Sequence, residues 1–414
     1  MKEQILAGQN DPAQLEHLYR SNKGAFKSEF TELYPEIKDA SLAAFWKERL
    51  SYAGEEINWG VGRELPIVIL AALIAGLIAK SPAFLGIDED FFYPRNLGFI
   101  VFPVLSAYLA WKNNLSLKKI GIIGVAMLAG LIYINSLPDF PENDTLILAC
   151  IHLLVVLWFL FGTAFLGEQG ENQEKRLGFL KFNGDLVVLS ALICIAGGIM
   201  TGVTIGLFQL IGINIEEFYF QNIVVFGLPA VPVIATFLNT TNPQLVGKVS
   251  PVIARLFSPL VLVMLVIYLG AMVLSGKDPY SDREFLLIFN ILLIGVMALI
   301  FFSIAETSGK TKSKPEIWIL ILLSLVTVVV NGVALSAILF RISEWGITPN
   351  RLAVLGANVL ILANLLIVTV QLFRASSKNQ NLNKVGGAIA KYLPVYFIWA
   401  IVVTFLFPLI FGIN

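Results

Sequence analysis

The sequence predicts an all-α integral membrane protein, a bundle of about eleven transmembrane helices with a small N-terminal cytoplasmic helical segment. The first observation is composition: 57% of the residues are hydrophobic and 14% are charged, against about half and a quarter in soluble domains. The second is the order of the residues, because eleven long apolar runs alternate with short polar segments. The third is the placement of Lys and Arg, which all lie outside these runs or at their edges.

The apolar runs begin after residue 64 and most have the length of a membrane-spanning helix. A bilayer core of about 30 Å requires roughly 20 helical residues. The first two runs are short, so either flanking residues complete them or they form a re-entrant pair that leaves nine full spans. The predicted spans are 65–79, 97–111, 120–137, 145–166, 186–211, 221–238, 256–275, 285–305, 317–340, 352–373 and 392–411.

The loops between these runs carry very different numbers of cations. When they are assigned alternately to two sides, 23 of the 29 Lys and Arg residues fall on the side of the N-terminus and six on the other. Cytoplasmic loops are enriched in Lys and Arg. The sequence therefore predicts a membrane protein with its N-terminus in the cytoplasm and its C-terminus outside. The six cations on the outer side are Lys80, Arg95, Lys277, Arg283, Arg341 and Arg351.

The chain divides into a polar segment, 1–60, and a polytopic transmembrane domain, 61–414. The polar segment has the pattern of three short amphipathic helices. Asp11 is a suitable N-cap, and Pro12 suits the first helical turn. The pair Tyr34-Pro35 is expected to end the second helix, because the residue before a proline disfavours the helical conformation.

The sequence lacks the residues and motifs that several classes of function need. The predicted spans hold no Asp, Glu, Lys or Arg at mid-depth, whereas proton pumps and ion-coupled transporters normally need such groups. Zinc-protease and serine-hydrolase motifs are absent, and Cys150 and Cys194 resemble small core residues. Net charge is zero, so no general field attracts nucleic acid. We therefore expect no catalytic residue, no metal and no cofactor, and a membrane lipid as the surroundings.

Neutral polar residues do occur inside the later spans. Spacings of three, four and seven place them on common helix faces. They predict either a polar cleft that binds a neutral or zwitterionic solute, or hydrogen bonds between helices, which are common in membrane bundles. The residues concerned are Asn290 in the eighth span, Ser324, Thr327 and Asn331 in the ninth, and Asn358, Asn364 and Gln371 in the tenth.

The sixth span contains Gly227, Pro229 and Pro232 within six residues. Proline removes a backbone donor from a helix, and broken helices are typical of transporter binding sites. This segment is a candidate for substrate contact, with an ordinary proline kink as the alternative. The fifth span carries glycines four residues apart, a pattern that favours close approach of another helix. These are Gly198, Gly202 and Gly206.

The segment 341–351, with the sequence RISEWGITPNR, is the most specific string in the chain. Gly346 suits the left-handed position after a helix. Thr348 suits an N-cap and Pro349 the first helical position. The geometry of the turn does not require its two arginines or Glu344. They either pair with each other or hold a lipid phosphate, so Arg341, Glu344 and Arg351 are candidate lipid contacts.

This string resembles the signature R-I-x-E-[YW]-G-[LI]-T-x-N-R of a bacterial multi-pass membrane family known only as domain of unknown function 4153. The positions that carry the resemblance are Arg341, Glu344, Gly346, Thr348, Asn350 and Arg351. Trp345 and Ile347 stand where tyrosine and leucine are more usual. The hydrophobic pattern is similar over residues 60–411. The resemblance implies an integral membrane fold in a bacterial cytoplasmic (inner) membrane, and it transfers no activity, substrate or catalytic residue.

Three functions are compatible with these patterns. The first is permease-like handling of a small neutral, zwitterionic or lipid-like substrate. The second is a non-transporting membrane sensor or scaffold, whose cytoplasmic head, residues 1–60, binds a protein partner. The third is a lipid head-group enzyme near the 341–351 turn. The aromatic residues expected to contact a partner in the second case are Phe26, Phe30, Phe45 and Trp46.

Overall fold

The computed structural model describes most of the chain, and all regular structure in that part is helical. The chain forms two compact units, Met1–Trp59 and Gly60–Asn414. The described residues are 2–8, 10–21, 23–37, 42–51, 64–168, 170, 172–210, 213–245, 257–267, 269–270, 280, 283–306, 314–378 and 382–413.

Among its described residues the N-terminal unit holds four helices rather than the three expected. They are α1 (Lys2–Ala7), α2 (Pro12–Ser21), α3 (Lys23–Ile37) and α4 (Ala43–Ser51). Asp11 caps α2 as predicted, because its carboxylate accepts the N–H groups of Ala13 and Gln14 at 2.9 and 3.2 Å. The predicted break at Tyr34-Pro35 is wrong. α3 continues through Pro35 to Ile37, and burial of Ile37 in the core of this unit supports its last turn.

A compact aromatic core holds the N-terminal unit together. Phe26, Phe30 and Trp46 are each at most 2% exposed, and the Phe26 and Trp46 rings lie 5.0 Å apart. The Arg49 guanidinium lies over Trp46 at 4.6 Å. Three of the four aromatic residues expected to contact a partner therefore form the unit's own core. Only Phe45 among those four is exposed.

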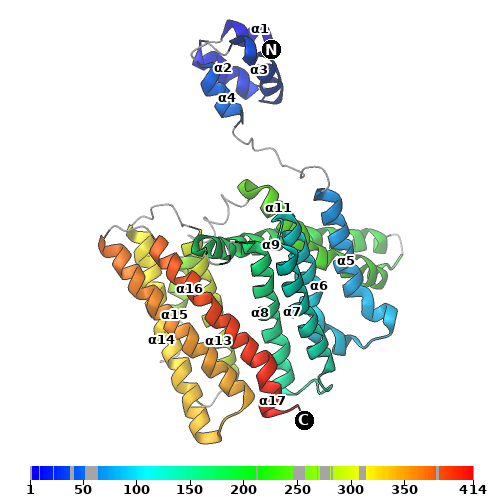
Figure 1. Cartoon of the computed structure of the whole chain (residues 1–414), viewed down its shortest axis with the longest axis vertical. Coiled ribbons are helices and arrows are strands. Elements are labelled where there is room, and N and C mark those ends of the chain that lie inside the picture. Colours follow the sequence, from blue (N-terminus) through cyan, green and yellow to red (C-terminus); the bar gives the residue numbers. More distant parts are fainter. Residues whose placement is uncertain are drawn as a thin grey trace. The chain divides into compact units, whose positions relative to one another are not determined.

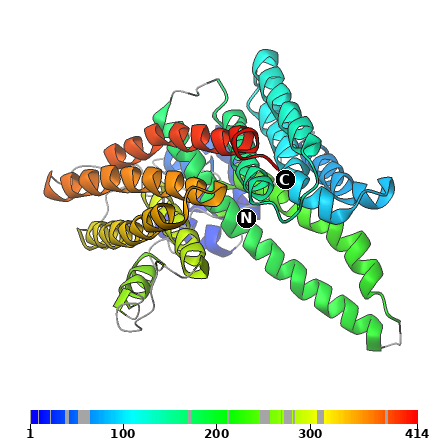
Figure 2. The same ribbon diagram turned by 90° about the horizontal axis from the view of Figure 1, so that it is seen from below.

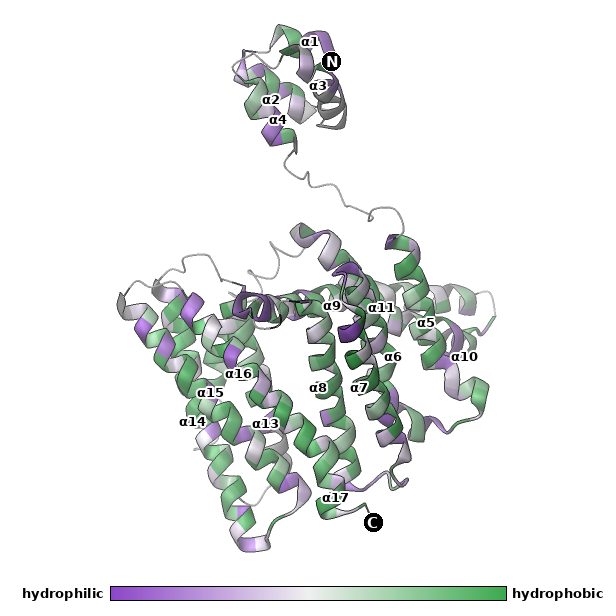
Figure 3. Ribbon diagram, viewed as in Figure 1, coloured by the Kyte–Doolittle hydropathy of each residue, from purple (hydrophilic) through white to green (hydrophobic). Residues whose placement is uncertain are grey.

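The second unit consists mainly of long helices (Figure 1). Hydrophobic residues cover most of their length, and hydrophilic residues gather mainly near their ends (Figure 3). The described elements are α5 (Glu64–Leu85), α6 (Glu89–Lys112), α7 (Leu117–Ser136), α8 (Asp144–Leu166), α9 (Gln173–Leu210), α10 (Glu216–Tyr219), the π-helix η1 (Phe220–Val224), α11 (Val225–Thr241), the 3₁₀-helix η2 (Pro243–Leu245), α13 (Arg283–Ala305), α14 (Lys314–Trp345), α15 (Pro349–Lys378), α16 (Asn383–Ile401), the π-helix η3 (Val402–Leu406) and α17 (Phe407–Phe411).

Eight helical segments among the described residues are long and apolar enough to cross a membrane. They coincide with eight of the predicted runs. The other three runs, 97–111, 256–275 and 285–305, fall on α6, on the helix Phe257–Ile267 and on α13. Part of 256–275 lies outside the described residues. The first two runs, short in the sequence, belong to helices of 22 and 24 residues, because polar ends extend both.

The helices pack in two groups, each with its own apolar core. α5, α6, α7, α8 and α11 form one group, and α13, α14, α15 and α16 form the other. α9 contacts both groups, since it packs on α11 and α8 and also on α13 and α16. Figure 2 shows α9 crossing the molecule diagonally between them. The second half of α9 is largely exposed, and no atom lies within 4 Å of a Cβ placed at Gly198, Gly202 or Gly206.

Two short π-helices interrupt the helical hydrogen-bond pattern, and a side chain from a neighbouring helix compensates each. Lys80 on α5 donates to the carbonyl of Gln221 in η1 at 2.6 Å. Tyr133 on α7 donates to the carbonyl of Phe405 in η3 at 3.1 Å. π-helical turns leave backbone groups without their usual partners. Lys80, one of the six cations on the cation-poor side, thus has a structural role.

Candidate functional site

The polar residues predicted to share a site do come together between α13, α14 and α15. The Asn358 amide donates to the Asn290 side-chain oxygen at 2.9 Å, and the Asn331 amide donates to the Asn358 carbonyl at 3.2 Å. Asn331 and Asn358 are at most 1% exposed. These contacts join three helices inside an apolar core, which is the arrangement expected of interhelical hydrogen bonds.

Several neighbouring polar residues donate hydrogen bonds within or between helices, while the buried side-chain oxygens of Asn331 and Asn364 have no hydrogen-bond partner among the described residues. Ser324 and Thr327 donate to carbonyls one turn back in their own helix, at 2.9 and 2.6 Å. Asn364 donates to the Tyr396 hydroxyl of α16 at 2.9 Å. The geometry therefore favours the second interpretation of this pattern, helix pairing, over a solute cleft.

Gly227, Pro229 and Pro232 lie on α11, away from that cluster. α11 packs mainly on α5 and α9 and runs continuously through both prolines. Pro229 is buried, whereas Gly227 is exposed, with no atom within 4 Å of a Cβ placed there. The expected opening of the helix lies instead one turn earlier, at the π-helix η1.

The turn 341–351 is tightly organised around Trp345. Both guanidinium groups, those of Arg341 and Arg351, lie 5.7 Å from the indole ring. Arg351 also donates to the carbonyls of Trp345 and Gly346 at 2.9 and 2.8 Å, which satisfies the end of α14. Arg341 donates to the carbonyl of Tyr280 at 2.9 Å.

The predicted caps of this turn are present. Gly346 has a φ of +77°, and the Thr348 hydroxyl accepts the Arg351 N–H at 3.3 Å. Glu344 is exposed, and no ion pair joins it to either arginine in the described part of the chain. Asn350 is half-buried in the first turn of α15. The arginines thus donate several hydrogen bonds to backbone carbonyls, and these bonds hold the turn together.

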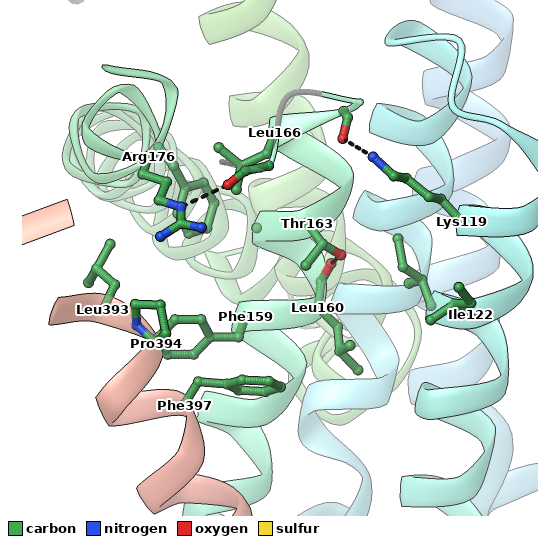
Figure 4. A pocket seen from close by; sticks show the side chains of 15 residues that line it. Lys119, Ile122, Phe159, Leu160, Thr163, Leu166, Arg176, Leu393, Pro394 and Phe397 are labelled. Carbon is green, nitrogen blue, oxygen red and sulfur yellow. Dashed lines mark hydrogen bonds between the residues drawn. The ribbon is translucent and has the colours of Figure 1, made fainter. Parts of the chain in front are cut away.

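A different site emerges at the end of the bundle where α8 ends and α9 begins. An apolar groove of about 440 Å³ lies between α7, α8, α9 and α16. Aliphatic and aromatic side chains form its walls, and two cations stand at one end (Figure 4). The lining residues are Lys119, Ile122, Ile123, Phe159, Leu160, Gly162, Thr163, Leu166, Gly167, Gly170, Arg176, Phe179, Leu393, Pro394 and Phe397.

The loop after α8 fixes the cations at this end. Lys119 donates to the Gly167 carbonyl at 3.0 Å and pairs with the Glu168 carboxylate at 2.8 Å. Arg176 donates through Nε to the Gly170 carbonyl at 2.8 Å. The hydrogen bond from Lys119, together with that from the Ser116 N–H, lowers the pKa of Glu168 to about 2. Glu168 is therefore a carboxylate at any physiological pH.

Local chain geometry explains why the groove forms here. Gly167 ends α8 with a φ of +64°, a conformation that suits glycine. Asn172 then caps α9, since its side chain accepts the N–H groups of Glu174 and Lys175. α9 leaves in a new direction and is held close to α8 where the Phe179 ring covers Gly162. Arg176 and Phe179 of α9 therefore line the groove beside α8.

Two other cavities have less suitable chemistry for a ligand that is both charged and apolar. The cavity of about 720 Å³ between α5, α6 and α7 is apolar, with Ser81, Asn96 and Ser106 as its polar members and no charged residue. The recess of about 610 Å³ at α9, α15 and α16 holds Lys384 and Lys391 but few apolar residues. Only the first groove among these three combines apolar walls with cations.

Buried ion pairs outside the groove were not predicted. Lys112 pairs with Glu64 at 2.5 Å and donates to Thr240 at 3.0 Å, while Tyr108 donates to Glu64 at 2.7 Å. This cluster ties α5, α6 and α11 together. Lys181 on α9 pairs at 3.0 Å with the buried Glu306, which directly follows α13. These groups bind one another, so both clusters are best explained as contacts between helices.

The fold and its apolar helices define a multi-pass helical membrane protein. No family model, curated protein or solved structure matches the chain. The resemblance of the 341–351 turn to domain of unknown function 4153 therefore stays a prediction. Within the described residues, no group of three or more His, Cys, Asp or Glu side chains is arranged to hold a metal ion.

Proposed function

We propose that this membrane protein is permease-like and handles a lipid-like amphiphile, which binds in the groove between α7, α8, α9 and α16. The single observation that carries the proposal is the groove's composition. Its walls are apolar, and its charged lining residues, Lys119 and Arg176, lie where α7 and α9 begin. Ligand pockets of this kind combine an apolar body with a few polar groups that fix orientation.

A lipid-like ligand fits the molecule better than a small neutral or zwitterionic solute. The buried amides that would have lined a solute cleft, Asn331 and Asn358, already bond neighbouring helices. The groove offers mainly carbon atoms along its length, so it favours an acyl chain or a similar apolar body. Its capacity of about 440 Å³ also lies in the range of ordinary ligand pockets, about 300 to 1,000 Å³.

The proposal includes eleven spans in a bacterial inner membrane, with a cytoplasmic N-terminus and an external C-terminus. The unequal distribution of Lys and Arg supports this orientation. Lys119 and Arg176 belong to the cation-rich side. The groove would then open toward the cytoplasmic leaflet, where its charged end meets lipid head groups.

A tryptophan in the groove tests the proposal. Thr163 is exposed to the groove, so Thr163→Trp should fill it and reduce the lipid retained by the purified protein in native mass spectrometry. Transfer of a fluorescent lipid between leaflets of proteoliposomes should fall in parallel. The matched control is Val125→Trp, at an exposed residue of α7 outside the groove lining, which should change neither. Equal lipid retention in both variants would contradict the proposal.

A second candidate function is a sensor or scaffold that binds a protein through residues 1–60. The observation in its favour is that Met1–Trp59 forms a unit with its own core. Phe45 is the one predicted aromatic contact left exposed. Deletion of residues 1–55 tests this function. The deletion should abolish the phenotype that the full-length protein confers on its cell, and it should leave lipid retention by the purified protein intact. An unaffected phenotype would exclude this function.

The lipid head-group enzyme at the 341–351 turn has less support. Arg341 and Arg351 bond backbone carbonyls, and Glu344 is exposed without an ion pair to either arginine in the described residues. A nucleophile and base within hydrogen-bonding distance are required for such chemistry. The turn shows no such pair among its described side chains.

A further inference from the structure

We infer that the amphiphile bound in the groove carries a phosphate in its head group, and that this phosphate takes the place of the Glu168 carboxylate on Lys119 while also binding Arg176. The inference rests on the proposed function and names the ligand class. In this arrangement the Glu168 carboxylate competes with the phosphate for Lys119.

Arg176 is suited to bind an anion at the groove. Its Nε is held by the Gly170 carbonyl at 2.8 Å, which fixes the guanidinium plane. Figure 4 shows the guanidinium facing Phe159, Leu393 and Pro394 across the groove. An arginine fork binds phosphate through paired N–H groups, so a phosphate at the groove's charged end meets an oriented donor set.

Lys119 already holds an anion at the same end. The Glu168 carboxylate lies 2.8 Å from its ammonium and accepts the Ser116 N–H at 3.1 Å. A carboxylate held by an ammonium and a backbone N–H marks a position that a phosphate oxygen also fits. Because the Glu168 side chain is 54% exposed, it can swing into solvent without leaving a buried charge.

The apolar walls decide between a lipid and a free anion. A soluble phosphate would use only the charged end and leave the walls of Ile122, Leu160 and Phe397 uncovered. A phospholipid covers both parts, with its chain along the walls and its phosphate at the cations. Charge and apolar surface therefore point to the same molecule.

The experiment measures binding of three ligands to the full-length protein: dioleoyl phosphatidylglycerol, dioleoylglycerol and inorganic phosphate. We expect phosphatidylglycerol to bind about tenfold more tightly than dioleoylglycerol, a difference of about 1.4 kcal/mol, because only its phosphate accepts charge-assisted hydrogen bonds from the two cations. Lys119→Gln and Arg176→Gln should each remove about that factor. Lys118→Gln and Lys175→Gln, which remove the same charge from adjacent residues outside the groove lining, should leave affinity nearly unchanged.

The Glu168→Gln variant shows whether the Glu168 carboxylate competes with the phosphate for Lys119 or only supports the structure around Lys119. Loss of the competing carboxylate should tighten phosphatidylglycerol binding several-fold without changing dioleoylglycerol binding. Weaker binding in Glu168→Gln, equal affinity for the two lipids, or equal effects of Lys118→Gln and Lys119→Gln would each overturn the inference. Full displacement of the lipid by millimolar inorganic phosphate would identify a soluble anion instead. If Thr163→Trp leaves the binding of every lipid unchanged, the proposed function itself fails, which is a distinguishable result.

Discussion

Among single residues, Glu168 has the most informative titration behaviour. Its pKa is lowered from the ordinary 4.5 to about 2, first by the Lys119 hydrogen bond and then by the Ser116 N–H. A carboxyl whose pKa is lowered on folding contributes stability above its unfolded pKa and loses it as the pH falls through its folded pKa. The Lys119–Glu168 contact should therefore persist at pH 4 and be lost near pH 2.

The titration can be followed directly. With carbon-13-labelled glutamate, the Glu168 carboxyl resonance should titrate near pH 2 in the wild type and at a clearly higher pH in Lys119→Gln, still below 4.5 because the Ser116 N–H remains. Lys118→Gln should leave the titration where it is in the wild type. A wild-type midpoint near 4.5 would show that Lys119 does not hold this carboxylate, and would remove the basis for its role as a competitor.

Glycines at helix contacts provide a second prediction for single residues. A Cβ at Gly184 would overlap the Phe302 ring, whereas one at Gly178, in the same helix α9, meets no atom within 4 Å. Overpacking typically costs about 1–3 kcal/mol, and alanine recovers up to about 1 kcal/mol of helix propensity. Gly184→Ala should therefore lower the unfolding midpoint in detergent, and Gly178→Ala should leave or raise it. Equal midpoints would contradict the close packing of α9 on α13.

Between elements, the asparagine contacts make a quantitative prediction. Because Asn358 donates to Asn290, Asn290→Leu and Asn358→Leu should show a coupling of about 0.6 kcal/mol, with about 1.7 as an upper value, in a double-mutant cycle. Asn364 bonds Tyr396 instead, so Asn290→Leu with Asn364→Leu should be nearly additive. Unfolding in mixed micelles gives both values. Additivity in the first pair would remove the proposed link between α13 and α15.

The sequence predicts the helical elements better than their contacts. Hydrophobic runs locate the spans because a bilayer imposes both length and apolarity on a helix, and cap chemistry correctly predicts local features such as Asp11, Gly346 and Thr348. The continuation of α3 past Pro35 is not predicted, since burial of Ile37 outweighs the local preference of Tyr34. The first two runs look short in the sequence because polar residues such as Glu64 extend their helices.

The groove itself cannot be predicted from the sequence. Lys119 and Arg176 are 57 residues apart, and each matches an ordinary cation at the end of a span. Their common position depends on the direction that α9 takes after Gly167, which no periodicity encodes. By contrast, helical spacing does reveal the polar face of the ninth span formed by Ser324, Thr327 and Asn331. A polar cluster among the eighth, ninth and tenth spans was therefore predicted, although spacing alone left its role open.

For the whole molecule, orientation is a prediction from charge alone. A reporter fused after Asn414 should be active outside the cell, and one inserted at Gln380 should be active in the cytoplasm. This pattern follows from the excess of Lys and Arg on the side of the N-terminus. The reverse pattern would place the groove's charged end in the outer leaflet and contradict the proposed cytoplasmic opening.

The central claim is that a phospholipid occupies the groove between α7, α8, α9 and α16. A single-particle structure of the full-length protein in nanodiscs containing phosphatidylglycerol tests this most directly. We predict elongated density along Ile122, Leu160 and Phe397, with a head-group feature at Arg176 and Lys119 and the Glu168 carboxylate displaced. A groove without density, in a map that resolves lipid elsewhere around the bundle, would contradict the claim.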